Sequence, residues 1–182
     1  MLTNLKKLKG LYKDGENIID FLKQNYGENY DINQYAEISY DLQAGSYIKK
    51  AQENPFDERE RGEEFAKVLN QFGNYKSIIE CGVGEGTSHS SIIPFLSNDD
   101  YKFLGFDVSY SRIQYARSHL SINYRSISNE LFLGDYFNCP LGDNSVEVVY
   151  TVHSMEPSGG KEIDILRELF RVTSKYLVLF EP

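Results

Sequence analysis

The spacing of apolar residues changes near residue 72, and this change divides the chain into two regions. Before it, apolar residues recur at helical intervals in a polar background, which predicts helices. After it, short apolar runs alternate with longer amphipathic stretches. We therefore predict an N-terminal helical extension over residues 1–72 and a core of alternating strands and helices over residues 73–182.

Short apolar runs of strand length occur repeatedly in the second region. They cover residues 77–79, 103–107, 131–133, 146–152 and 176–180. The stretches between them predict helices over residues 87–96, 110–120 and 161–173. Strands that alternate with helices form right-handed β-α-β units and a parallel sheet. The predicted fold class is α/β, with a Rossmann-like, mostly parallel, doubly wound sheet.

Residues near the helix ends refine this prediction. Thr87 and Ser109 are the expected N-caps of the helices that follow them. Pro94 is expected to kink the first of these helices or to end it early. The last helix is expected to bury one apolar face. That face consists of Ile163, Leu166, Leu169 and Phe170.

The overall composition narrows the classes of partner. The chain has 182 residues and a net charge of -8. Because this charge disfavours binding to the phosphate backbone of a nucleic acid, we expect no nucleic-acid partner. Two cysteines, Cys81 and Cys139, fit a reducing compartment. No apolar run approaches a membrane span, and the N-terminus lacks the apolar core of a signal peptide. We therefore expect a cytoplasmic protein without membrane contact.

A glycine-rich segment follows the first predicted strand. Gly82, Gly84 and Gly86 fall at every second position, and Glu80 precedes them. Glycine permits positive φ and lets a ligand lie against bare backbone, and a helix start offers free N–H groups. The segment therefore predicts a site for a nucleotide-like cofactor with an anionic or carboxylate portion. A dinucleotide fingerprint would place its third glycine where this chain has Thr87, which disfavours a nicotinamide cofactor.

Three candidate positions follow the later strands. Asp107 ends the second strand, where an acid can accept hydrogen bonds from ribose hydroxyls; the alternative is an acid at a helix N-terminus. Asp135 and Tyr136 follow the third strand, and the alternative there is a plain surface turn. His153 follows the fourth strand and could act as a general base. The alternative is that His153 only lines the cofactor pocket or bonds backbone.

Together, these positions resemble the motifs of the class I S-adenosylmethionine (SAM)-dependent methyltransferases. The resemblance covers roughly residues 70–182 and looks closest to the small-molecule branch called type 11 or domain 25. The E-x-x-R-V stretch of that branch corresponds to Glu168 through Val172, but the Pro-Gly-Gly that usually follows is missing. The resemblance implies SAM as cofactor, S-adenosylhomocysteine as product and methyl transfer to a small-molecule acceptor.

The resemblance also implies roles for individual residues. Glu80 and the three glycines would hold the methionine end of SAM, and Asp107 would hold the ribose. Asp135 and Tyr136 would frame the adenine, and His153 is the catalytic candidate near the acceptor. The other expected cofactor-binding residues are Thr87, Val108 and Val152. No metal ligands are expected.

An aromatic-rich segment over residues 40–47 precedes the core. In the methyltransferases that this chain resembles, such N-terminal segments often fold over SAM as a lid. Gln43 and Tyr47 are therefore further candidates for contact with the cofactor or the acceptor. The alternative is a helical packing segment, because aromatic residues lie more often in a core than in a site.

The sequence ends at residue 182, directly after the fifth predicted strand. The sheet of the methyltransferase fold usually continues to seven strands, so we expect its C-terminal strands to be absent. The fifth strand would then be an apolar edge, which proteins normally avoid. A truncated or shortened chain is the favoured explanation, and cover by the N-terminal helices or by a second copy in a homodimer is the alternative. A non-catalytic SAM-binding or methyltransferase-fold protein that acts through partners stays the alternative function.

Overall fold

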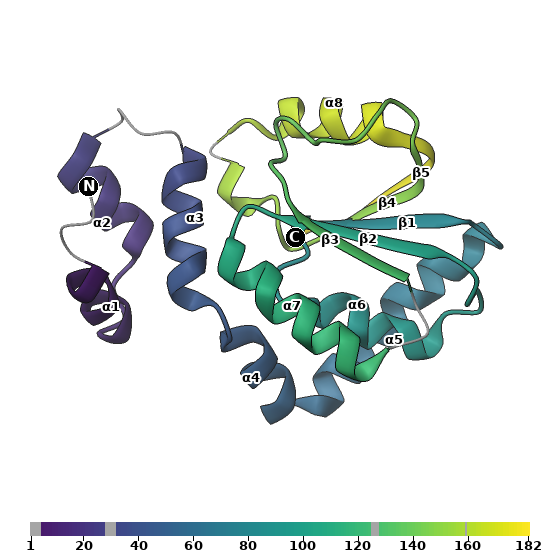
Figure 1. Ribbon diagram of the computed structural model, residues 1–182, viewed down its shortest axis with the longest axis horizontal. Coiled ribbons are helices and arrows are strands. Elements are labelled where there is room, and N and C mark those ends of the chain that lie inside the picture. The colour runs from purple at the N-terminus through teal and green to yellow at the C-terminus, as the bar shows by residue number, and fades with distance from the viewer. Residues whose placement is uncertain (1–4, 28–31, 125–127, 159) are drawn as a thin grey trace.

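Five parallel strands form one sheet between layers of helices, in the right part of the molecule as seen in Figure 1. The computed structural model describes residues 5–27, 32–124, 128–158 and 160–182. The strands are β1 (Ser77–Cys81), β2 (Lys102–Asp107), β3 (Ser128–Leu133), β4 (Val146–Val152) and β5 (Thr173–Phe180). Their order in the sheet is β3-β2-β1-β4-β5. This arrangement confirms the predicted α/β class and the parallel, Rossmann-like sheet.

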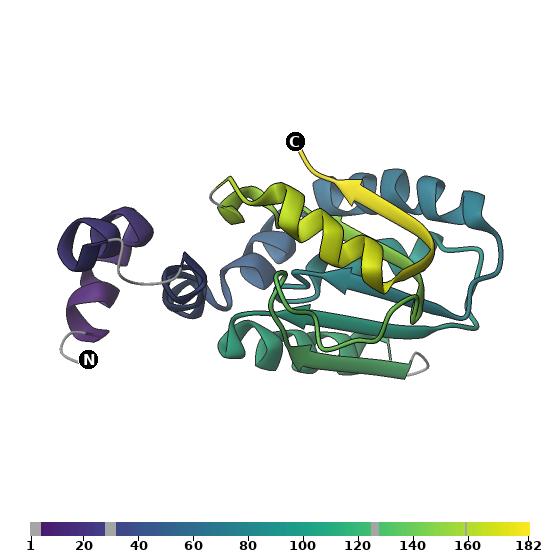
Figure 2. The same ribbon diagram turned by 90° about the horizontal axis from the view of Figure 1, so that it is seen from above.

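Helices cover both faces of the sheet (Figures 1 and 2). They are α5 (Pro55–Leu69), α6 (Thr87–Ile92) and α7 (Tyr110–Asn123) on one face and α8 (Glu162–Val172) on the other. Side chains alternate along each strand, so β1 sends Ile78 into the cluster under the first three helices and Ile79 into the cluster under α8. Among these helices, none combines the length and apolar character that a membrane crossing requires within the described residues.

The predicted helix ends are partly confirmed. The Ser109 hydroxyl accepts a hydrogen bond from the Arg112 N–H at 3.2 Å and caps α7 as expected. α6 ends at Ile92, and a 3₁₀ turn, η3 (Ile93–Phe95), follows it, as Pro94 predicted. The N-cap prediction for Thr87 is wrong. Gly86 holds that position with φ of 76° and makes no side-chain cap. Of the first N–H groups of α6, that of His89 bonds to Glu80.

The predicted core face of α8 is confirmed for Leu166 and Leu169, which pack in the cluster under this helix, and wrong for Ile163 and Phe170. Ile163 is 61% exposed and Phe170 is 64% exposed, whereas Ile165, Leu169 and Val172 are buried. Two apolar stripes overlap on this helix, and the sequence pattern alone does not choose between them. The rotation follows from polar residues on the flank of α8 that bind the loop after β3, as described below.

The predicted extension consists of three structural parts. α1 (Leu5–Lys13) and α2 (Ile18–Tyr26) pack with α3 (Ile32–Gln43) around a small apolar cluster away from the sheet (Figure 2). α3 also contacts α7, and α4 (Ser46–Glu53) contacts α5 and α6. α5 itself covers the sheet. The division near residue 72 stays a prediction.

β5 lies at one edge of the sheet. The Phe180 ring stacks on the Phe65 ring of α5 at 4.2 Å between centroids, and Tyr176 stacks on Phe72 of the 3₁₀ turn η2 (Asn70–Phe72) at the same distance. The segment before β1 therefore covers one face of this strand. Leu179 is 43% exposed. Homodimer formation through this edge stays a prediction.

Replacing Gly62 of α5 with alanine is expected to destabilise the protein. An alanine Cβ there would lie 2.2 Å from the Ser91 carbonyl oxygen of α6. In an exposed helix the same change usually stabilises by about 1 kcal/mol, but overpacking costs about 2 kcal/mol. The net loss of about 1 kcal/mol should lower the Tm in thermal unfolding by about 3 °C. Gly10→Ala in α1, where no atom lies within 4 Å, is the matched control and should leave Tm equal or higher. Equal behaviour of the two variants would contradict the close packing of α5 on α6.

Candidate active site

A cavity of about 290 Å³ lies beyond the carboxyl ends of β1, β2 and β4. The strand order reverses between β1 and β4, and ligands of open parallel sheets bind at such a switch point. The wall is completed by Ala36 and Tyr40 of α3 and by Tyr47 of α4. Segments from both predicted regions of the chain therefore meet at one site.

The glycine turn after β1 forms the floor of this cavity. Gly82, Gly84 and Gly86 all have positive φ, between 55° and 76°. A Cβ at Gly82 would lie 2.6 Å from both the Tyr136 hydroxyl and the Ser154 side chain, so only glycine fits there. Gly86 packs against Leu120 of α7 and does not line the cavity.

Asp107 lies at the end of β2 and is buried. One carboxylate oxygen accepts the Gly84 N–H at 3.0 Å and the other accepts the Ser109 N–H at 2.8 Å. Burial raises the pKa of this carboxyl, while the hydrogen bonds and the nearby Arg112 oppose the shift. Each oxygen can accept a further bond, so Asp107 can hold the turn and still bind hydroxyls in the cavity.

Glu80 is a buried acid that lines the same cavity from the end of β1. The Tyr150 hydroxyl donates to its Oε2 at 3.0 Å. Burial raises the pKa of Glu80 to about 8, and the neighbouring charge of Asp107 adds to the shift. The ion pairs among the described residues do not include Glu80. A cationic ligand group would favour its ionised form.

The loop after β3 places Asp135 and Tyr136 in the cavity wall. The Asp135 carboxylate accepts the Phe137 N–H at 2.9 Å and shapes the start of the loop. The Tyr136 hydroxyl donates to the Cys81 carbonyl at 2.6 Å, and burial raises its pKa. Because that hydroxyl is engaged with β1, Tyr136 can offer a ligand its ring more readily than its oxygen.

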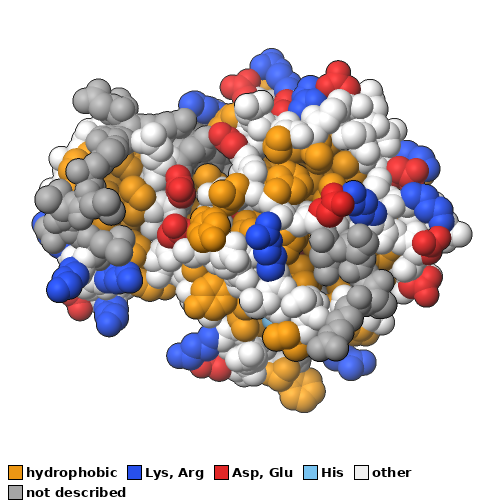
Figure 3. Space-filling model, viewed as in Figure 1, with side chains coloured by type: hydrophobic (Ala, Val, Ile, Leu, Met, Phe, Trp, Pro, Cys, Tyr) orange, Lys and Arg blue, Asp and Glu red, His pale blue; other side chains and the backbone are white. Residues whose placement is uncertain are grey.

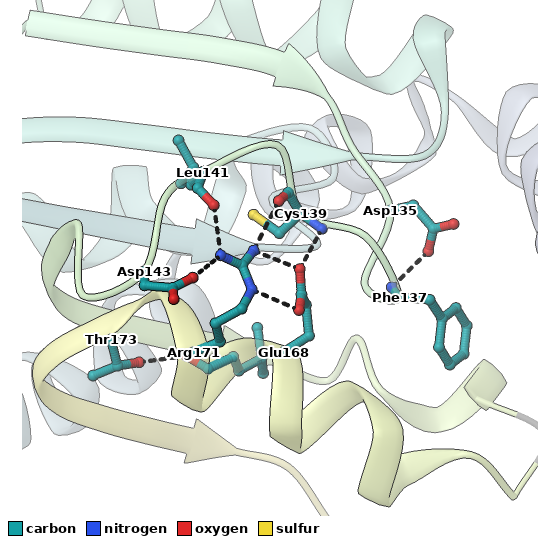
Figure 4. A network of polar contacts seen from close by, with 9 residues as sticks. Asp135, Phe137, Cys139, Leu141, Asp143, Glu168, Arg171 and Thr173 are labelled. Atoms are coloured by element: carbon teal, nitrogen blue, oxygen red, sulfur yellow. Dashed lines mark hydrogen bonds and ion pairs between the residues drawn. The ribbon is translucent and has the colours of Figure 1, made fainter.

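Two residues of α8 hold this loop in place (Figure 4). Glu168 accepts the Cys139 N–H at 2.9 Å. Arg171 donates to the Cys139 and Leu141 carbonyls at 3.1 and 2.9 Å, and it pairs with Asp143 at 2.7 Å. The E-x-x-R part of the sequence stretch therefore anchors the cavity loop and fixes the rotation of α8.

The loop after β4 carries His153 with a φ of 45°, which is uncommon for a residue other than glycine. Such strain often occurs at functional sites. His153 is exposed and lines the cavity, and its N–H donates to the Phe180 carbonyl at 3.0 Å. The Glu181 carboxylate accepts the Ser154 N–H at 3.1 Å and supports the turn. The role of His153 as a general base stays a prediction.

Arg112 of α7 is a cavity residue that the sequence analysis missed. Its guanidinium is buried and lies over the rings of Tyr40 at 4.2 Å and Tyr47 at 4.9 Å. It donates to the Gln43 side chain at 3.2 Å. Gln43 thus lies behind the cavity wall and not in it. No local signal could reveal this group, because α7 meets the N-terminal segment only in the folded chain.

Two further carboxylates join the N-terminal segment to the core. Glu85 of the glycine turn accepts the Gly45 and Ile48 N–H groups at 2.9 Å each and so caps α4. Asp41 of α3 accepts the Ser111 N–H at 3.0 Å and the Ser109 hydroxyl, at the start of α7. Each segment therefore satisfies the free N–H groups of a helix in the other.

The cavity brings together most of the residues that the sequence analysis selected. Those that line it are Tyr47, Glu80, Gly82, Gly84, Thr87, Asp107, Val108, Asp135, Tyr136, Val152 and His153. Gln43 and Gly86 lie outside it. In the described ranges, no group of three or more His, Cys, Asp or Glu side chains is placed to hold a metal ion.

Comparison with known proteins identifies the fold. No protein-family model and no curated protein sequence matches the chain. A SAM-dependent methyltransferase from Aquifex aeolicus is similar in structure, with a TM-score of 0.56, 21% identity and coverage of 71% of this chain and 70% of that one. A putative S-adenosyl-L-methionine-dependent methyltransferase from Methanococcus maripaludis has a TM-score of 0.59, 16% identity and coverage of 84% and 66%.

The [4+2]-cyclase SpnF is also similar, with a TM-score of 0.53, 17% identity and coverage of 64% of this chain and 43% of that one. The chain thus spans less than two thirds of the length of some of the proteins that it resembles. At these identities the likeness shows a shared fold, the class I methyltransferase fold.

Proposed function

We propose that this chain, which has the class I methyltransferase fold, binds S-adenosyl-L-methionine in the cavity and transfers its methyl group to a small-molecule acceptor. The observation that carries the proposal is the pairing of two buried acids, Glu80 and Asp107, around one glycine turn at the switch point of the sheet. Similar structures are named as SAM-dependent methyltransferases, which supports the same cofactor here.

The residues of the cavity fit such a cofactor. Glu80 has no cation beside it in the described structure and would pair with the amino group, while Asp107 would accept hydrogen bonds from the ribose hydroxyls. Gly82 leaves room that any Cβ would fill. Asp135 and Tyr136 would frame the adenine. Arg112 supplies positive charge in the wall, and its Nε has no hydrogen-bond partner among the described residues.

For methyl transfer, the protein mainly has to orient the cofactor and the acceptor. The sulfonium of the bound cofactor makes its methyl group electrophilic, so an acceptor nucleophile can displace it in line. The chain would position the two reactants and exclude water. His153 lies in the loop after β4 and lines the cavity. It is the residue proposed to face the acceptor and to take a proton from it.

A small acceptor in the cytoplasm is part of the same proposal. On the face shown in Figure 3, basic and acidic side chains are mixed among the described residues, without a broad basic area for a nucleic-acid backbone. Both cysteines are free and buried, in keeping with a reducing compartment.

The alternative function is a protein with this fold that does not transfer methyl groups. The similarity to a [4+2]-cyclase favours keeping it, because that protein is named for a different reaction. Formation of S-adenosylhomocysteine in the presence of an acceptor would exclude this alternative.

Titration calorimetry with SAM, S-adenosylhomocysteine and NAD tests the proposed cofactor. We expect the first two to bind with dissociation constants of about 1–100 μM and NAD not to bind. Binding would justify a screen of small-molecule acceptors by mass spectrometry. Binding of NAD, or of neither SAM compound, would contradict the proposal.

A further inference from the structure

A chain of four polar side chains runs from the core to the cavity. It comprises Tyr101 before β2, His89 of α6, Tyr150 of β4 and Glu80 of β1. His89 and Tyr150 have no exposed surface, and the other two are buried. Burial of polar groups costs free energy unless they bond to one another, so an apolar core would be the simpler solution. Only Glu80 of the four lines the cavity.

The hydrogen bonds among these four side chains are all donated in the direction of Glu80 when that residue is ionised. The Tyr150 hydroxyl donates its one proton to Glu80 at 3.0 Å. Its 2.7 Å contact with His89 Nδ1 must then be a bond that Tyr150 accepts. Burial lowers the pKa of His89 to about 3, so the ring carries one proton, on Nδ1. Nε2 is left to accept the Tyr101 hydroxyl at 3.4 Å.

Aromatic packing fixes the members of this chain. The His89 ring stacks on Phe103 with 3.5 Å between centroids and an interplanar angle of 5°. Tyr150 meets the Phe180 ring edge-on at 6.3 Å. Neither side chain can turn away from its partner without disrupting the core. The donor that reaches Glu80 is therefore held in place before any ligand arrives.

The protein groups that face the Glu80 carboxylate in the described part of the chain do not include a cation. They are the Tyr150 hydroxyl from β4, the Ser88 side chain and His89 backbone from α6, and the Asp107 carboxylate from β2. None of these is a cation. Tyr150 and His89 reach Glu80 from the core and Ser88 reaches it from the cavity wall, so the side of Glu80 that faces the cavity is left for a positively charged ligand group.

We propose that Tyr150 and His89 are positioning residues that orient the Glu80 carboxylate toward the amino group of the amino-acid end of the cofactor. This inference rests on the proposed function. It assigns recognition of the amino group to a chain of buried donors behind the cavity and not to Glu80 alone. Binding of a ligand with the same nucleoside but without the amino acid, such as 5′-methylthioadenosine, would not depend on Tyr150 and His89.

Tyr150→Phe tests the inference because it keeps the ring and removes the hydroxyl. We expect affinity for S-adenosylhomocysteine to fall about 10-fold, while affinity for 5′-methylthioadenosine stays within about twofold. Tyr75→Phe is the matched control, since Tyr75 is also buried and its hydroxyl has no hydrogen-bond partner among the described residues. It should change neither affinity. An equal loss for both ligands in Tyr150→Phe, or no loss for either, would overturn the inference.

His89→Phe tests whether His89 acts on Glu80 through the Tyr150 hydroxyl. It removes the donor to Tyr150 and keeps a planar ring on Phe103, so it should weaken S-adenosylhomocysteine binding less than Tyr150→Phe does. The double variant should be no weaker than Tyr150→Phe alone, because both changes act through one hydroxyl. Independent, additive losses would contradict a single chain.

A ligand-free measurement separates this inference from the proposed function. The NMR titration of the Glu80 carboxyl carbon should show a higher pKa in Tyr150→Phe than in the wild type, because the lost hydrogen bond favoured the anion. A raised pKa without SAM binding would sink the proposed function alone and leave Glu80 positioned for another cation. An unchanged pKa would overturn the positioning role itself.

Discussion

Asp107→Asn is expected to weaken S-adenosylhomocysteine binding about 100-fold, because two charge-assisted hydrogen bonds to the ribose would be lost or weakened. The amide would also turn its NH₂ toward the N–H of either Gly84 or Ser109, both of which the carboxylate now satisfies. The glycine turn would loosen as a result. Calorimetry at pH 7.5 measures the change. Unlike Tyr150→Phe, this variant should lose 5′-methylthioadenosine as well, since both ligands carry the ribose.

Asp100→Asn is the matched control for this experiment. Asp100 is exposed and pairs with Lys76 near the start of β2, at the far end of the strand from the cavity. Its replacement should leave binding unchanged. Unaltered affinity in Asp107→Asn would show that Asp107 is only a structural acid at the end of β2.

Glu80→Gln should abolish recognition of the amino-acid end and, at the same time, stabilise the ligand-free protein at alkaline pH. Loss of a buried charge partner weakens binding by at least about 100-fold. The stability effect has the opposite direction. Burial raises the pKa of Glu80 from 4.5 to about 8 in the folded protein, so the folded state binds the proton more tightly than the unfolded chain does.

The contribution of Glu80 to stability is fully present below pH 4.5 and is lost as pH rises to about 8. Glutamine has no such loss. Thermal unfolding should therefore give similar Tm values for the two proteins at pH 4.5 and a Tm several degrees higher for Glu80→Gln at pH 8.5. A variant less stable than the wild type at pH 8.5 would mean that Glu80 is ionised and compensated without a ligand.

The sequence predicted the sheet because buried strands leave a simple signal. Runs such as residues 146–152 are mostly apolar and almost entirely buried, and β4 has the predicted bounds. The glycine turn and Asp107 were also predictable, because local backbone demands select these residues. Five strands are present in the described residues, as predicted, and the additional strands usual in the fold are not among them.

The errors occurred where contacts between distant segments decide the outcome. The rotation of α8 depends on Glu168 and Arg171 binding the loop after β3, about 30 residues earlier in the chain. Gln43 was a candidate for contact with a ligand. It lies outside the cavity and bonds Arg112, a partner 69 residues away, so its contact with a ligand stays a prediction. Helical periodicity contains no information on either contact.

The mutual capping by Glu85 and Asp41 has a consequence for turnover. The cavity wall formed by Tyr40 and Tyr47 cannot swing outward unless α4 gives up Glu85 and α7 gives up Asp41, and both carboxylates lie at the junction that would open. We expect the escape of a bound nucleoside to require that these contacts break. For the proposed methyl transfer, we expect a rapid first turnover followed by a slower steady rate set by departure of the product.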